Sequence, residues 1–178
     1  MNSDDAFRPI HLNQHEPFRW HGVDEHVYKA ENDLASFKEV TRRKLFIDPE
    51  KTGIELRYFE VAANGHTTLE KHDHTHLVIP IKGNWSCLVD DQVFKLEINN
   101  VVHVPSWSWH QFRASDEETL GFLCLVTCDR DRPTLPTKED IEALFEHFVI
   151  KVSSNINLHL YKLFLVLLIE ELLLAEFL

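Results

Sequence analysis

Positive charge is scarce in this sequence. It holds 18 Lys and Arg residues against 29 Asp and Glu residues, which gives a formal net charge of −11 at pH 7. Domains that bind nucleic acid carry clustered basic side chains, because contacts to the phosphate backbone supply much of the affinity. The acidic balance therefore argues against a nucleic-acid partner, although it says little about the fold.

Cysteine is also sparse. Cys87, Cys124 and Cys128 form no CxxC pair, and their odd number does not suit a disulfide framework, so each is expected to be a small buried hydrophobe. The first ten residues are acidic and polar, unlike a secretory signal peptide. A reduced, cytoplasmic setting is the simplest expectation. A chain of 178 residues buries roughly 70% of its unfolded surface, so one domain can fold without disulfides.

A long uncharged apolar run is missing too. Residues 158–178 are apolar on every side, but Lys162, Glu170, Glu171 and Glu176 interrupt them. No uncharged stretch reaches the roughly 18 residues that a spanning helix needs, so no spanning membrane helix is expected. Three interpretations stay open, in this order: a buried or dimer-forming helix, an aberrant tail, and a membrane-associated helix. An exposed apolar patch would drive association, so a homodimer is one expectation.

What the sequence does contain is a series of short strands. Apolar or alternating segments rich in β-branched and aromatic residues lie at 37–47, 54–62, 76–83, 84–90, 92–96, 101–105 and 119–128. Turn signals separate them, among them Asn64-Gly65 and Asp90-Asp91. Strands this short and this regularly spaced predict an antiparallel sandwich or barrel over residues 36–130.

The two ends of the chain have a different pattern. Residues 1–35 carry charges, prolines and little periodicity, so they are expected to form an arm whose histidines face solvent. Residues 131–178 are expected to form a helical extension. Its first helix should start at Thr137, with Glu139 and Asp140 in the first turn, and end near Phe148.

The densest chemistry lies in residues 64–83. Glu70, His72, His74 and His76 are spaced by two, and residues two apart in a strand share a face. Such a polar face is costly to bury without partners. A divalent metal would satisfy it, because imidazole and carboxylate are good ligands for first-row metals. A straight strand would separate residues 70 and 76 by roughly 20 Å, which is too far for both to bind one metal. A turn must therefore fall between them, near Asp73.

The spacing from Asn64 to Gly83 resembles the first motif of the cupin superfamily. Reading along it, Glu70, His72 and His76 stand at the three ligand positions. The second cupin motif falls on residues 99–114, where Pro105 and His110 match but the two Gly positions and the final Asn do not. This resemblance implies a small single-domain cupin. Its fold would be an all-β double-stranded β-helix (jelly-roll) barrel, with an N-terminal arm and C-terminal helix or helices.

The resemblance also implies a ligand set for one divalent ion, with Fe, Mn, Ni, Cu and Zn all candidates. Cupins usually supply three histidines and one glutamate, and here Glu and His have exchanged places: Glu70, His72, His76 and His110. An alternative alignment with a shortened loop uses His74 in place of Glu70. Alternation does not separate the two, because all four window residues share a face.

Family membership alone does not fix a function. Cupins include dioxygenases, decarboxylases, isomerases, storage proteins and regulatory domains, and no helix-turn-helix pattern precedes this barrel. The leading hypothesis is a metal-dependent enzyme, with dioxygenase chemistry favoured, that acts on a small organic substrate. Aromatic residues around His110 suggest that this substrate is partly apolar. The alternative is a non-catalytic cupin that binds a metal or small molecule, and nothing in the sequence separates these two.

Overall fold

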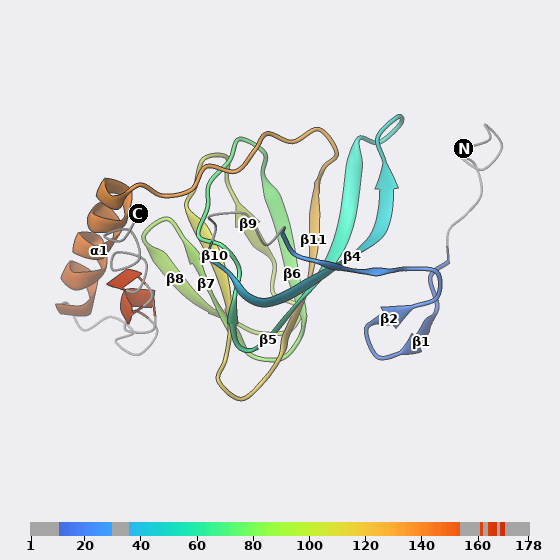
Figure 1. Cartoon of the computed structure of the whole chain (residues 1–178), viewed down its shortest axis with the longest axis horizontal. Coiled ribbons are helices and arrows are strands. Elements are labelled where there is room, and N and C mark those ends of the chain that lie inside the picture. The colour runs from blue at the N-terminus through green and yellow to red at the C-terminus, as the bar shows by residue number, and fades with distance from the viewer. Residues whose placement is uncertain (1–10, 30–35, 154–160, 162–163, 167, 170–178) are drawn as a thin grey trace.

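The structure is a computed structural model, which describes residues 11–29, 36–153, 161, 164–166 and 168–169. Within these residues the chain forms eleven strands and one long helix, α1 (Lys138–Ser153) (Figure 1). The strands are β1 (Gln14–Glu16), β2 (Arg19–Trp20), β3 (Glu25–Val27), β4 (Lys38–Asp48), β5 (Ile54–His66), β6 (His76–Lys82), β7 (Trp85–Val89), β8 (Gln92–Leu96), β9 (Val102–Val104), β10 (His110–Ala114) and β11 (Leu120–Thr127).

One nine-stranded antiparallel sheet curls into a jelly-roll barrel. Its order is β8-β7-β10-β5-β11-β6-β9, with β4 paired to β5 and β3 paired to β4. In Figure 1 the curled sheet occupies the middle of the molecule, with α1 at one end and the β1–β2 hairpin at the other. The predicted all-β jelly roll with an N-terminal arm and a C-terminal helix is confirmed. The domain boundaries placed at residues 35 and 130 stay a prediction.

The inner face of the barrel changes from apolar to polar along the β5–β11 pair. Val61 pairs with Leu120, Phe59 with Phe122, and Arg57 with Cys124. The rings of Phe59 and Phe122 stack with centroids 5.2 Å apart, and those side chains are almost fully buried. Directly paired residues point to the same side of a sheet, and residues two apart on a strand share a face. Arg57 and Cys124 therefore also point into the barrel, where they add polar groups next to the apolar pairs.

The Asn64-Gly65 dipeptide does not make the predicted hairpin turn. Strand β5 runs through it to His66, and its last residue pairs with Arg113 of β10 rather than with β11. Asn64 takes a left-handed φ of 60° and its N–H donates to the carbonyl of Ser115 at 2.8 Å. The dipeptide therefore bends β5 from one neighbour to the next, because its partner groups come from a distant segment.

Helix α1 begins as predicted and ends later. The Asp140 N–H donates to Thr137 Oγ1 at 3.2 Å, and the Thr137 N–H donates to Asp140 Oδ2 at 2.9 Å. These reciprocal bonds satisfy backbone donors at the helix start. The helix continues past Phe148 to Ser153.

An apolar cluster joins α1 to the outside of the barrel. Leu88 and Trp109 of the barrel pack in one cluster with two further groups of buried residues. Helix α1 supplies Ile141, Leu144 and Phe148, and the C-terminal segment supplies Tyr161, Phe164 and Leu168. The buried-helix interpretation of the tail fits these described positions, and the rest of residues 154–178 lies outside the described residues. Among the residues that the structure describes, no helix is long and apolar enough to span a membrane.

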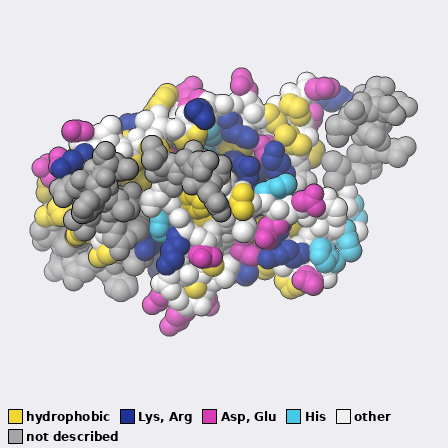
Figure 2. Space-filling view, viewed as in Figure 1, with side chains coloured by type: hydrophobic (Ala, Val, Ile, Leu, Met, Phe, Trp, Pro, Cys, Tyr) yellow, Lys and Arg dark blue, Asp and Glu magenta, His cyan; other side chains and the backbone are white. Residues whose placement is uncertain are grey.

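The surface of the arm is polar. The arm histidines in the described range, His11, His15, His21 and His26, are exposed as expected. Figure 2 shows histidine side chains gathered over the hairpin end, and acidic and basic side chains interspersed over the barrel.

Candidate metal centre

Three histidines converge in the barrel although the sequence separates them widely. His76 opens β6, His110 opens β10, and His72 lies in the loop before β6. Each offers a ring nitrogen, and these atoms all lie within 4.8 Å of one another. The Nε2 atoms of His72 and His76 are 2.8 Å apart. All three side chains are buried, with 1%, 8% and 3% of their surface exposed.

A bend at Asp73–His74 brings His72 and His76 together. Asp131 holds the bend from outside, because its carboxylate accepts the N–H groups of Asp73 at 2.9 Å and His74 at 3.4 Å. The Asp73 carboxylate in turn accepts the Trp107 indole N–H at 3.1 Å. The turn that the sequence required near Asp73 is therefore confirmed.

Backbone carbonyls fix the tautomers of two of the rings. His72 Nδ1 lies 2.8 Å from the His74 carbonyl oxygen, and His110 Nδ1 lies 3.0 Å from that of Ser108. A carbonyl oxygen can only accept, so each Nδ1 must carry the proton and each Nε2 must present a lone pair. This arrangement is typical of histidines that bind metals.

The electrostatics of the group favour neutral imidazoles. Burial is the main cause that lowers the pKa of His72 to about 4, together with the neighbouring His110 and His74. Burial and the neighbouring His110 and His72 also lower the pKa of His76. Burial is the main cause that lowers the pKa of His110. All three rings are therefore neutral imidazoles at neutral pH, the state that a metal ligand requires.

These residues fit a divalent metal. Metal–nitrogen bonds of about 2.1 Å place neighbouring ligand atoms roughly 3 Å apart, close to the 2.8 Å between the Nε2 atoms of His72 and His76. Three converging lone pairs also repel one another unless a cation or a shared proton lies between them. The arrangement thus defines a candidate three-histidine metal site.

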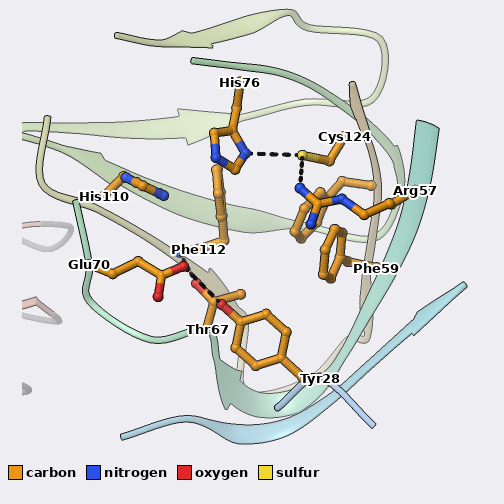
Figure 3. A pocket seen from close by; sticks show the side chains of 10 residues that line it. Tyr28, Arg57, Phe59, Thr67, Glu70, His76, His110, Phe112 and Cys124 are labelled. Atoms are coloured by element: carbon orange, nitrogen blue, oxygen red, sulfur yellow. Dashed lines mark hydrogen bonds between the residues drawn. The ribbon is translucent and has the colours of Figure 1, made fainter. Parts of the chain in front are cut away.

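A cavity of about 50 Å³ adjoins the histidines (Figure 3). Figure 3 shows Arg57 and Cys124 on one side of it and Glu70 and Tyr28 on another. Its lining combines the polar residues Tyr28, Arg57, Thr67, Glu70, His76, His110 and Cys124 with the aromatic residues Phe59, Phe112 and Phe122.

Glu70 lies on the cavity wall but is held by other partners. Its backbone exchanges two hydrogen bonds with His110, at 3.2 and 3.0 Å. Its carboxylate pairs with the ammonium of Lys29 and accepts from the Tyr28 hydroxyl at 3.4 Å. Burial and the nearby Glu70 raise the pKa of Tyr28, which keeps its phenol protonated.

His74 is not among the residues that line the cavity. Its ring stacks on that of His72 with centroids 3.6 Å apart, and its Nδ1 lies 2.7 Å from Asp131 Oδ1. His72, His74 and Asp131 form a second group of potential ligands. The assignment of Glu70 or His74 as the fourth ligand stays a prediction.

Sequence reasoning missed Arg57, Cys124, Tyr28 and Lys29. Cys124 was expected to be an inert buried side chain, yet its Sγ lies 3.1 Å from His76 Nδ1 and 3.5 Å from Arg57 Nη2. Strand alternation could have identified Arg57, because it lies two residues from the inward-facing Phe59 and therefore shares its face. Of the aromatic residues near His110, only Phe112 lines the cavity, since Trp109 packs with α1 and Trp107 is 53% exposed.

A jelly-roll barrel with a group of converging histidines at an internal cavity is typical of cupins, and sequence similarity agrees that the chain is one. Residues 57–126 match the family model described as "Cupin domain". The chain is 47% identical over 143 residues to 1-methylthio-D-xylulose 5-phosphate methylsulfurylase of Rhodospirillum rubrum, an alignment that covers 80% of this chain and 88% of that relative. The chain belongs to the cupin family.

Solved structures agree with this assignment. A cupin 2 conserved barrel domain protein from Rhodopseudomonas palustris is 42% identical, with a TM-score of 0.71 and coverage of 77% of this chain and 93% of the other. A cupin-2 domain protein from Rhodospirillum rubrum is also 42% identical, with a TM-score of 0.70 and coverage of 83% and 97%.

Proposed function

We propose that this protein is a metal-dependent cupin enzyme that acts on a small, oxygen-rich organic substrate. The observation that carries the proposal is the convergence of His72, His76 and His110, of which His76 and His110 line a cavity. A closed structural site has four protein ligands and no room for a further one, whereas a catalytic site keeps a position open. Three neutral imidazoles next to a cavity match the second description.

His72, His76 and His110 would hold the metal through nitrogen atoms, with Glu70 or His74 as a fourth ligand, and a six-coordinate ion would still keep two positions open for substrate. A bound divalent ion would supply Lewis-acid polarisation of a substrate carbonyl or hydroxyl. Iron, manganese, nickel, copper and zinc remain candidates, because histidine-rich sites accept all of them.

The residues around the cavity suit a substrate with a polar and an apolar side. The rings of Phe59, Phe112 and Phe122 offer an apolar wall. The Glu70 carboxylate could accept a proton from a bound substrate, and the protonated Tyr28 hydroxyl could donate a hydrogen bond. Water would be excluded from much of this space, because the lining side chains are largely buried.

The relative from Rhodospirillum rubrum suggests a specific reaction. Its name places 1-methylthio-D-xylulose 5-phosphate as its substrate, and it is 47% identical across most of both chains. We propose that the present chain transfers a methylthio group from this sugar phosphate, or from a similar thio-substituted ketose, to a thiol. In that step a sulfur–sulfur bond forms, the carbon–sulfur bond breaks, and its electron pair stays on the sugar carbon, which then takes a proton.

Oxygenase chemistry, which the sequence favoured, has no supporting observation beyond the candidate metal site. The non-catalytic binding protein also stays an alternative. The cytoplasmic setting and the homodimer remain predictions.

The experiment is a proton NMR assay of 1-methylthio-D-xylulose 5-phosphate with the purified protein, dithiothreitol and each of the five metals in turn. The account predicts loss of the S-methyl signal of the sugar phosphate with at least one metal. An oxygen electrode runs in parallel. An unchanged S-methyl signal with every metal would contradict the proposed reaction, and oxygen uptake with a keto acid or diol would favour the oxygenase instead.

A further inference from the structure

Arg57 is a buried cation without an anionic partner in the part of the chain that the structure describes. Only 8% of its surface is exposed, and its Nε is buried without a hydrogen-bond partner. The Nη2 atom lies 3.5 Å from Cys124 Sγ, a weak acceptor. The guanidinium also lies over the Phe59 ring, 5.0 Å from its centroid. Among the described residues, no carboxylate oxygen lies within 4.0 Å of the charged nitrogen atoms of Arg57.

Glu55, a buried charge on the same strand, has ion-pair partners that Arg57 does not have among the described residues. Glu55 lies two residues before Arg57 in β5 and is fully buried. Its carboxylate has two cationic partners, Arg130 at 2.5 Å and Lys44 at 3.8 Å. The charge of Glu55, the carboxylate nearest to Arg57 in sequence, is therefore already balanced by Arg130 and Lys44. A buried charge without a counter-ion is strongly unfavourable, so an anion bound beside Arg57 would stabilise it.

The cavity is where such an anion would fit. Arg57 lines it together with His76, His110 and Glu70. In Figure 3 the guanidinium lies beside Cys124 and on the side of the cavity away from Glu70. The space of about 50 Å³ suits a small charged group, and the negative Glu70 is already paired with Lys29.

We infer that Arg57 binds an anionic oxygen group of the substrate next to the histidine cluster. The group would be the phosphate of a sugar phosphate or the carboxylate of an organic acid, since the planar guanidinium fork matches both. This inference rests on the proposed function, because it names the charge that the substrate of that site must carry. It also assigns Arg57 a role in substrate binding that the histidine set does not supply.

The test measures anion binding without turnover. Inorganic phosphate and acetate, which represent the two sources, are titrated calorimetrically into metal-free and metal-loaded protein at constant ionic strength. The variants are Arg57→Gln, Arg57→Lys and the control Arg132→Gln, which changes an exposed arginine outside the cavity lining. We expect saturable binding of at least one anion by the wild type. The affinity should fall at least about ten-fold in Arg57→Gln, fall less in Arg57→Lys, and stay unchanged in Arg132→Gln.

Two further measurements keep the inference falsifiable. If Arg57→Gln does not fold, the rise in melting temperature that phosphate or acetate gives the wild type is compared with that of Arg57→Lys, where it should be smaller. The inference is overturned if the wild type binds neither anion, or if folded Arg57 variants bind as well as the wild type. Anion binding that depends on Arg57, without turnover of the sugar phosphate, would sink the proposed reaction alone. Turnover by Arg57→Gln with an unchanged KM would sink the inference alone.

Discussion

The Nε2 atoms of His72 and His76 lie 2.8 Å apart in the interior of the barrel. At that distance either one ring donates a hydrogen bond to the other, or both lone pairs face a cation. The Nε2 atoms of His72 and His110 are both acceptors, because each Nδ1 proton goes to a backbone carbonyl. A hydrogen bond between His72 and His76 would leave the lone pair of His110 without a partner within the cluster, whereas one divalent ion would satisfy all three rings.

The stability of the metal-free protein should fall in mild acid. Burial lowers the pKa of His72 to about 4 and also lowers those of His76 and His110, whereas histidines in the unfolded chain titrate near 6.5. Between pH about 4 and about 6.5 the unfolded state binds more protons, so stability decreases as the pH is lowered through this window. Urea unfolding midpoints of apoprotein across this range measure the effect.

The matched variant for this pH series is His72→Asn, which removes one of the buried titrating groups. Its unfolding midpoint should change less steeply with pH than that of the wild type. The exposed His103 provides the control, because His103→Asn should keep the wild-type slope. Identical slopes in all three proteins would contradict the prediction.

Glu70 and His74 can be separated by metal affinity. Glu70 lines the cavity together with His76 and His110, whereas the His74 ring is engaged by Asp131. We therefore expect Glu70→Ala to weaken metal binding by about ten-fold to a hundred-fold, and His74→Ala to weaken it less. Competition with a chromogenic chelator measures both constants. The opposite order would assign the fourth position to His74.

Cys124 should stabilise the site through His76. When His76 presents Nε2 to a metal, its Nδ1–H faces Cys124 Sγ at 3.1 Å. Cys124→Ala removes this acceptor and should cost about 1–3 kcal/mol of unfolding free energy, while Cys124→Ser keeps an acceptor and should cost less. Cys87 is the matched control, since it is also buried and lies in the apolar core. An equal loss in Cys87→Ala and Cys124→Ala would refute a polar role for Cys124.

The packing of the C-terminal segment gives a fourth prediction. Phe164 is 1% exposed and belongs to the cluster that contains Leu88 and Trp109, whereas Val166 is 55% exposed. Phe164→Ala should lower the unfolding free energy by about 3–5 kcal/mol, and Val166→Ala should change it by less than about 0.5 kcal/mol. Denaturant unfolding monitored by tryptophan fluorescence compares them. A neutral Phe164→Ala would mean that this segment does not cover the barrel.

The features that sequence predicted well are local ones. Strand periodicity identified β4, β5, β6, β7, β8, β9 and β11, because alternation and turn residues act over a few positions. The bend near Asp73 followed from the length of a straight strand, which would hold residues 70 and 76 too far apart to share one metal. The grouping of His72, His76 and His110 could be predicted from the resemblance to the two cupin motifs. That resemblance indicates which distant segments meet in the fold, and residue spacing alone does not.

The features that sequence did not predict depend on distant contacts. The partners of Glu70 come from the arm, 41 and 42 residues earlier in the chain. Arg57 meets Cys124 across 67 residues, through the register of β5 with β11. The hairpin turn predicted at Asn64-Gly65 was wrong for the same reason, because Asn64 donates to the carbonyl of the distant Ser115 and β5 continues through the dipeptide to His66. Local propensity was overridden by tertiary pairing in this case.

The metal content of the purified protein tests the central claim most directly. Plasma mass spectrometry is applied to the wild type, to the double variant His76→Ala with His110→Ala, and to a control with the exposed residues His26 and His103 changed to Ala. The account predicts about one divalent ion per chain in the wild type and the control, and almost none in the His76/His110 variant. Equal metal content in all three folded proteins would contradict a metal centre built on these histidines.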